Sequence, residues 1–132
     1  MVGWLALVCS ALLIVGIVSH TLARHLIQIS PLLLALGLGI YRPGFRAVAA
    51  LPLFTFWLIL MGGIWLSLLG IAQVFTGRWS VVEIVLTIVI GAASTAGLVA
   101  ASREGTSLSL SLRFAVILSF AVLQPVAMLL SF

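Results

Sequence analysis

The fold class of this chain follows from one stretch, Val81-Val-Glu-Ile-Val-Leu-Thr-Ile-Val-Ile-Gly-Ala-Ala-Ser-Thr-Ala-Gly-Leu-Val-Ala-Ala101. Only one of its side chains, that of Glu83, carries a charge. An α-helix rises about 1.5 Å per residue, so about 20 apolar residues cross the hydrocarbon core of a bilayer. Residues 81–101 are therefore predicted to form a transmembrane helix.

The composition of the whole chain supports this prediction. Hydrophobic residues make up 64% of the 132 residues and charged residues only 6%, against about 25% charged in soluble domains. All basic residues are Arg and they are scattered along the chain, which argues against nucleic-acid binding. The single cysteine, Cys9, cannot form an internal disulfide, and no cluster of Cys or His predicts a metal site.

Other apolar runs predict further membrane spans. Three of them reach spanning length, at about residues 2–19, 52–75 and 112–131. The second of these is predicted to begin at Pro52, because a proline is tolerated in the first turn of a helix. We therefore expect an all-α integral membrane bundle.

A shorter run, residues 26–41, leaves the number of spans open. It has about 16 residues between Arg24 and Arg42, which is below the usual spanning length. It has no polar face that would suit a helix lying in the membrane interface. We expect a single domain, residues 1–132, with four to five transmembrane helices, the fifth being this short one.

The distribution of Arg predicts the orientation of the chain. Cytoplasmic loops carry an excess of Arg and Lys. Residues 42–46 and 103–113 hold four of the six Arg residues, and both lie on the Arg-rich side whether the chain spans four times or five. We expect these two segments to be cytoplasmic. The compact, Arg-only composition favours a bacterial plasma (inner) membrane.

Glu83 has both a structural and a functional interpretation. Ser80-Val-Val-Glu83 precedes an apolar run, which is the pattern of a capping box. A carboxylate there also interacts favourably with the positive end of the helix dipole. The alternative is an ion or proton site, because ionisable groups inside membranes are expensive to bury and often functional.

Polar residues in the last two spans define a candidate transport path. Pro125 removes a backbone hydrogen bond and predicts a kink in the last helix. Gln124 and Ser119 lie at nearby depth and could satisfy the freed carbonyl. The candidate polar path consists of Glu83, Ser94, Thr95, Ser119 and Gln124.

His20 and His25 are weak candidates for cofactor binding. On a continuous helix they would lie about 140° apart, so they do not form a pair on one face. A turn between them could bring them together near one membrane surface, where haem or quinone contact is conceivable. The sequence identifies no particular cofactor.

Two further patterns predict helix packing or lipid contact. Small residues allow close approach of helix backbones, and the chain has them at Gly62, Gly63, Gly70, Gly91, Ala93, Thr95 and Gly97. A stripe of large side chains at helical spacing is predicted to contact lipid, a partner or another helix: Phe54, Trp57, Met61 and Trp65.

These patterns favour one functional hypothesis over two others. The abundant small residues, without any catalytic constellation, favour an accessory or packing subunit of a larger membrane complex, in contact with membrane lipid and with other subunits or further copies of itself. The alternative is a small oligomeric transporter or channel with a path between subunits. An enzyme is not expected, because too few carboxylate, histidine and thiol groups are present to converge.

Overall fold

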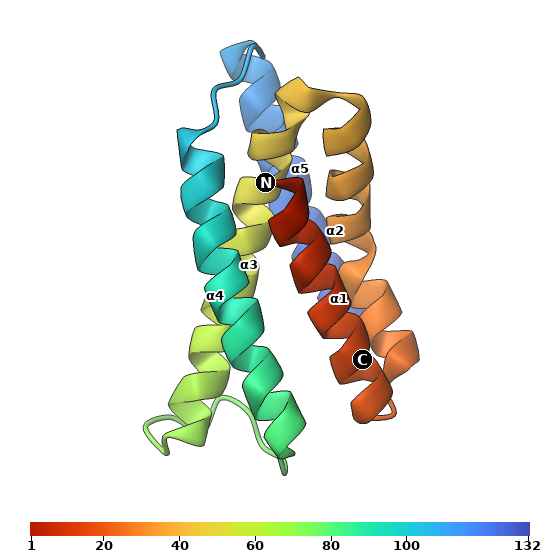
Figure 1. Ribbon diagram of the computed structural model, residues 1–132, viewed down its shortest axis with the longest axis vertical. Coiled ribbons are helices and arrows are strands. Elements are labelled where there is room, and N and C mark those ends of the chain that lie inside the picture. Colours follow the sequence, from red (N-terminus) through yellow and green to blue (C-terminus); the bar gives the residue numbers. More distant parts are fainter.

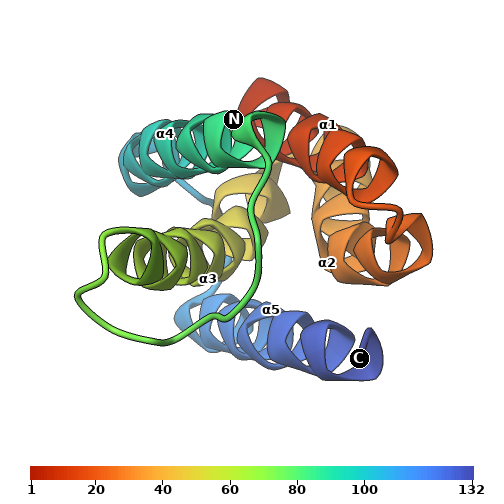
Figure 2. The same ribbon diagram turned by 90° about the horizontal axis from the view of Figure 1, so that it is seen from below.

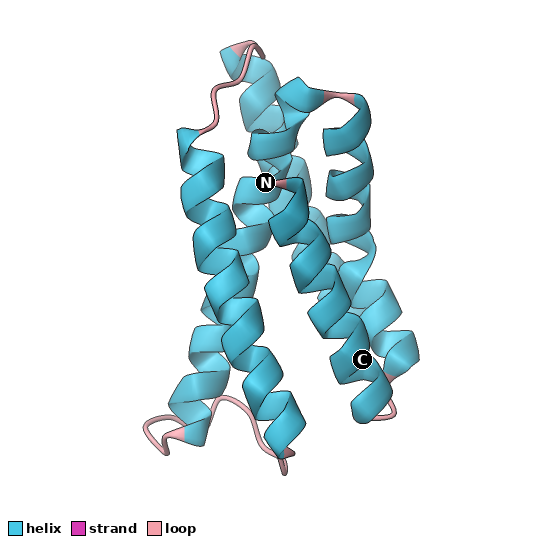
Figure 3. Ribbon diagram, viewed as in Figure 1, coloured by secondary structure: helices cyan, strands magenta, loops and turns pink.

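The computed structural model describes all 132 residues as a bundle of five helices (Figures 1 and 3). The predicted all-α membrane bundle is thus confirmed. The helices are α1 (Val2–Val18), α2 (Leu22–Tyr41), α3 (Pro43–Leu68), α4 (Val81–Arg103) and α5 (Leu110–Leu130). Helices α2 to α5 are long and apolar enough to cross a membrane, whereas α1 is an apolar helix of 17 residues.

Helix α2 resolves the uncertainty over residues 26–41. It has 20 residues because it begins at Leu22, four residues before the predicted start, and includes Arg24 in its first turn. The side chain of Arg24 is exposed near the end of the bundle, so its charge does not have to enter the hydrocarbon. Pro31 lies inside the helix, and the Ser30 hydroxyl donates to the Ile27 carbonyl that the proline leaves free (2.7 Å).

Helix α3 corrects the predicted span 52–75 at both ends. Pro43, not Pro52, occupies the first turn, and Pro52 lies within the helix. The helix ends at Leu68 because Gly70 adopts a φ of 72°. The amides of Gly70 and Ile71 then donate to the carbonyls of Ser67 (3.1 Å) and Leu66 (2.9 Å), which is a Schellman motif. Gly70 therefore terminates a helix rather than packing two together.

The two segments expected to be loops are shorter than predicted. Residues 42–46 are not a loop, because Arg42 alone separates α2 from α3 and residues 43–46 form the first turn of α3. The segment 103–113 is non-helical only from Glu104 to Ser109. Helix α5 starts at Leu110, two residues before the predicted start, because the Ser109 hydroxyl accepts from the Leu112 amide (3.4 Å) and caps it.

Small residues of α4 allow it to pack closely against α3. Ala93, Ser94, Gly97 and Ala101 are buried inside the bundle. A Cβ at Gly97 would overlap the ring of Phe54 on α3. A Cβ at Gly91 would lie 3.8 Å from the Cβ of Met61 on α3, which is an ordinary contact distance. Gly91, Ala93 and Gly97 of the predicted packing set thus serve contacts within this chain, whereas Thr95 is exposed on the outside of the bundle.

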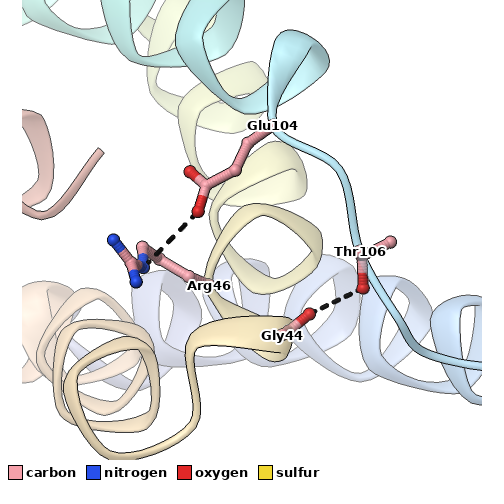
Figure 4. A network of polar contacts seen from close by, with 4 residues as sticks. All are labelled: Gly44, Arg46, Glu104 and Thr106. Atoms are coloured by element: carbon pink, nitrogen blue, oxygen red, sulfur yellow. Dashed lines mark hydrogen bonds and ion pairs between the residues drawn. The ribbon is translucent and has the colours of Figure 1, made fainter.

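The end of the bundle that holds Arg42 and Arg103 is tied together by polar contacts (Figure 4). Arg46 of α3 forms an ion pair with Glu104, which follows α4 (Nε to Oε1, 3.6 Å). The Thr106 hydroxyl donates to the Gly44 carbonyl (2.7 Å). These contacts hold the start of α3 against the segment between α4 and α5.

At the opposite end, α3 and α4 diverge from α1 and α2 (Figure 1). The segment 69–80, which joins α3 to α4, crosses this end of the bundle (Figure 2). The amides of Val74 and Phe75 both donate to the Ser67 hydroxyl (3.0 and 2.9 Å), which fastens the segment to the last turn of α3. Gly63 leaves room for it, because a Cβ there would lie 3.3 Å from the Phe75 ring.

Candidate ligand-binding cavity

A cavity of about 190 Å³ lies between the diverging helix ends. It receives side chains from all five helices and from the segment 69–80. Eleven of its fifteen lining residues are hydrophobic, and the four polar ones are His25, Gln28, Glu83 and Thr87. An apolar cavity with a few convergent polar groups is the usual form of a small-molecule site.

The large side chains of α3 form one wall of the cavity. Phe54, Trp57 and Met61 are buried in the bundle, and Trp57 and Met61 line the cavity. The predicted stripe therefore faces inward, not toward lipid or a partner. Trp65, its fourth member, is half-buried and does not line the cavity. The indole N–H of Trp57 is enclosed without a hydrogen-bond partner.

Glu83 and Thr87 come from one face of α4, since residues four apart on a helix are neighbours. The capping box predicted for Glu83 is confirmed: its Oε2 accepts from the Ser80 amide (2.7 Å), and the Ser80 hydroxyl accepts from the Glu83 amide (3.2 Å). The carboxylate is thereby held at the start of α4, where it also lines the cavity. Glu83 can therefore cap α4 and still interact with a ligand or ion in the cavity, so the two interpretations of this residue are compatible.

The two histidines do not converge. His20 is exposed in the turn after α1, with a φ of 57°. His25 lies on α2, is half-buried, and lines the cavity. Its Nδ1 lies 3.1 Å from both the hydroxyl and the carbonyl oxygen of Thr21. Of the two histidines, His25 alone therefore contributes to the cavity.

Gln124 and Gln28 form a buried hydrogen-bonded link between helices α5 and α2. The Gln124 Nε2 donates to the Gln28 carbonyl (3.0 Å), and the Gln28 Nε2 donates to the Ser131 hydroxyl (2.9 Å). Gln124 is fully buried and its Oε1 has no partner. Gln124 therefore fastens two helices together beside the cavity instead of lining it.

The rest of the predicted polar path is dispersed. Ser119 and Thr95 are exposed on the outside of the bundle and donate to the carbonyls of Ala115 (2.7 Å) and Gly91 (2.9 Å) in their own helices. Ser94 is buried without a partner for its hydroxyl and does not line the cavity. Of the five path residues, only Glu83 reaches the cavity.

Several cavity residues could not be recognised from the sequence. Gln28 was one polar residue in an apolar run, and Thr87 one more hydroxyl in a span. Phe75 and Trp79 lie in the segment 69–80, part of which was predicted to be helical. The one available signal was the four-residue spacing of Glu83 and Thr87, which places both on one helix face.

Four helices that are long and apolar enough to cross a membrane decide the class of this protein. This chain is a small multi-pass helical membrane protein. No protein-family model, curated protein or solved structure matches it. Its outward apolar side chains, such as Ile59 and Leu129, are accordingly surfaces in contact with membrane lipid.

Proposed function

We propose that this membrane protein binds an amphiphile, whose apolar part occupies the cavity between the diverging helix ends. The single observation that supports this function is the cavity itself, which is apolar along most of its wall and polar at four converging side chains. A cavity of about 150 Å³ lined by apolar residues is large enough to bind benzene. The present cavity, at about 190 Å³, accommodates a comparable apolar group, and a longer chain would have to extend beyond it.

A photoreactive alkyl alcohol in phosphatidylcholine nanodiscs tests this function. We expect saturable cross-linking to the cavity wall at Trp57 or Met61, with excess 1-dodecanol as competitor. The variant Met128→Trp places a larger side chain in the cavity wall and should reduce this cross-linking about tenfold or more, equivalent to at least about 1.4 kcal/mol of binding free energy.

Leu129→Trp is the matched control, because residue 129 is the next position of α5 and is exposed to lipid. It should cross-link like the unmodified protein. Cross-linking that is not saturable, or that Met128→Trp leaves unchanged, would mean that the probe reports only bulk lipid. Either result would overturn the proposed function.

Two other roles have weaker support. An accessory-subunit role depends on small residues that are free to pack against a partner, and Gly91, Ala93 and Gly97 of α4 are occupied by contacts within the chain. Gly37 and Gly62 still have open space around them on the surface and could accept a partner helix. A transport role is supported only by Glu83, since Ser119 and Thr95 point outward. Native mass spectrometry after mild extraction tests the subunit role, which predicts larger proteins bound in fixed ratio.

We also propose that the cavity lies at the extracytoplasmic side of a bacterial plasma membrane. With five helices crossing, Arg42, Arg46, Arg103 and Arg113 lie at one end, and only Arg24 and Arg78 lie at the cavity end. The positive-inside tendency places the four-Arg end in the cytoplasm.

Single cysteines introduced at Gly77 and Gly105 in a Cys9→Ala background test this orientation. In intact cells, a membrane-impermeant maleimide should label Gly77→Cys and leave Gly105→Cys unlabelled until the cells are opened. The reverse pattern would contradict the proposed orientation.

A further inference from the structure

Each of the four polar side chains of the cavity has a hydrogen-bond acceptor left over for a ligand. This follows from the hydrogen bonds that each side chain already makes. The first is His25. The Ser19 hydroxyl donates to the Val15 carbonyl (2.7 Å), so it must accept the hydrogen bond from the Thr21 hydroxyl (2.5 Å). The Thr21 hydroxyl and carbonyl can then only accept from His25 Nδ1. In the neutral imidazole, Nε2 is left without a proton and acts as an acceptor.

The Gln28 amide is oriented by the same kind of argument. The single proton of the Ser131 hydroxyl goes to the Met128 carbonyl (2.6 Å), so Ser131 can only accept from Gln28. The nitrogen of the amide therefore faces Ser131, and its oxygen, Oε1, is left without a hydrogen bond. The side chain is more than nine-tenths buried and lines the cavity.

Thr87 and Glu83 complete the set. The Thr87 hydroxyl donates its proton to the Ile84 carbonyl (2.7 Å), which leaves only its acceptor capacity. The Glu83 carboxylate can only accept, and one of its oxygens is free of the capping box. Four polar side chains from two helices thus present acceptors at the cavity, with one formal negative charge among them.

The rest of the lining favours the same kind of ligand. Trp57, Trp79 and Phe75 contribute aromatic rings, whose faces attract cations. No Arg lines the cavity, and Arg24 lies instead over the ring of Phe132, one of the lining residues (5.5 Å to the centroid). The side-chain donors of the lining that are neither enclosed nor engaged are the indole N–H of Trp79 and the second N–H of the Gln28 amide, whose first N–H is bound to Ser131.

We infer that the amphiphile bound in this cavity carries a primary ammonium group, which donates its hydrogen bonds to Glu83, Gln28, Thr87 and His25. This inference rests on the proposed function. A primary ammonium has three donors and one positive charge, and charge-assisted hydrogen bonds to a carboxylate are the strongest of their kind. Its source is either a free alkylamine or the headgroup of an aminophospholipid.

Competition in the cross-linking assay tests this inference with four 12-carbon amphiphiles at pH 7. Dodecylammonium should displace the probe at concentrations about tenfold lower than dodecyltrimethylammonium, dodecanoate or dodecanol, each corrected for partition into the nanodisc. The trimethylammonium compound has the same charge but no donors, so it separates hydrogen bonding from charge alone.

Substitutions identify which side chains of the cavity produce the preference for dodecylammonium. Glu83→Gln should abolish most of the preference for dodecylammonium over dodecanol, because Gln retains the capping box but not the negative charge. Thr87→Val should reduce the preference a few-fold. Glu104→Gln, which removes the other carboxylate at the opposite end of the bundle, is the matched control and should have no effect.

Each result has a distinct meaning. Equal competition by all four compounds, or equal competition by the two cations, would overturn the ammonium inference while leaving the amphiphile-binding function intact. Failure of every compound to compete would overturn the function itself. Nanodiscs that contain phosphatidylethanolamine distinguish the two sources: if they abolish the effect of added dodecylammonium, the headgroup is the ligand, and if they do not, the free amine is.

Discussion

Gly97→Leu is expected to separate α3 from α4 and to lower the free energy of unfolding by about 3 kcal/mol or more. A Cβ at position 97 overlaps the ring of Phe54, which is fully buried and cannot move away without displacing its neighbours. Cores packed to this density respond to added atoms with strain rather than relaxation. Reversible denaturation in mixed detergent micelles, followed by Trp fluorescence, measures the loss.

Thr95→Leu provides the control for this substitution. Thr95 lies two residues away on the same helix and is exposed on the outside of the bundle. Its replacement should change the free energy of unfolding by no more than about 0.5 kcal/mol. Adding Phe54→Ala to Gly97→Leu should restore part of the lost stability, because the two residues are in contact. Independent, additive effects would contradict the packing that we describe.

Gln124→Glu is expected to destabilise the bundle by about 3 kcal/mol. The Nε2 of Gln124 donates to the Gln28 carbonyl (3.0 Å), and a carboxylate oxygen at the same place would face that carbonyl without a proton between them. Gln124 is fully buried, so the new charge would have no water to stabilise it. The same denaturation measurement applies.

Gln124→Leu separates the hydrogen bond from the shape of the side chain. Leu loses the bond to Gln28 but also removes the buried Oε1, which has no partner. The two changes oppose each other, and hydrogen bonds between membrane helices contribute only about 0.6 kcal/mol on average. The free energy of unfolding should therefore change by less than about 1 kcal/mol. A larger loss for Leu than for Glu would show that Oε1 is hydrogen-bonded after all.

Helix boundaries show where sequence reasoning succeeded and where it failed. The start of α4 at Val81 was predictable, because Ser80 and Glu83 form a cap with each other and need no distant partner. The start of α3 was misplaced by nine residues, since Pro52 fits both the first turn and the interior of a membrane helix. Its end was misplaced because Gly70 fits a packing interface as well as a helix terminus.

The candidate site was less predictable than the helices. Glu83 and His25 were recognised as polar groups near membrane boundaries, but Gln28 and Thr87 had no distinguishing local pattern. Their relevance depends on which face of each helix points toward the cavity. Ser119, Thr95 and Thr87 have the same chemistry, and all three donate to carbonyls of their own helices. Only Thr87 lies on a face that points toward the cavity.

That this protein is an α-helical membrane bundle follows from its sequence, because the length of an apolar run and the positions of charges and caps are local properties. Three features depend on the tertiary structure: Gly91 and Gly97 of α4 pack against α3, Phe54, Trp57 and Met61 face inward, and four acceptors line one cavity. In a chain that is 64% hydrophobic, all faces of a helix are apolar enough for lipid. Composition therefore cannot distinguish inner from outer faces, and only the fit of one helix against another does so.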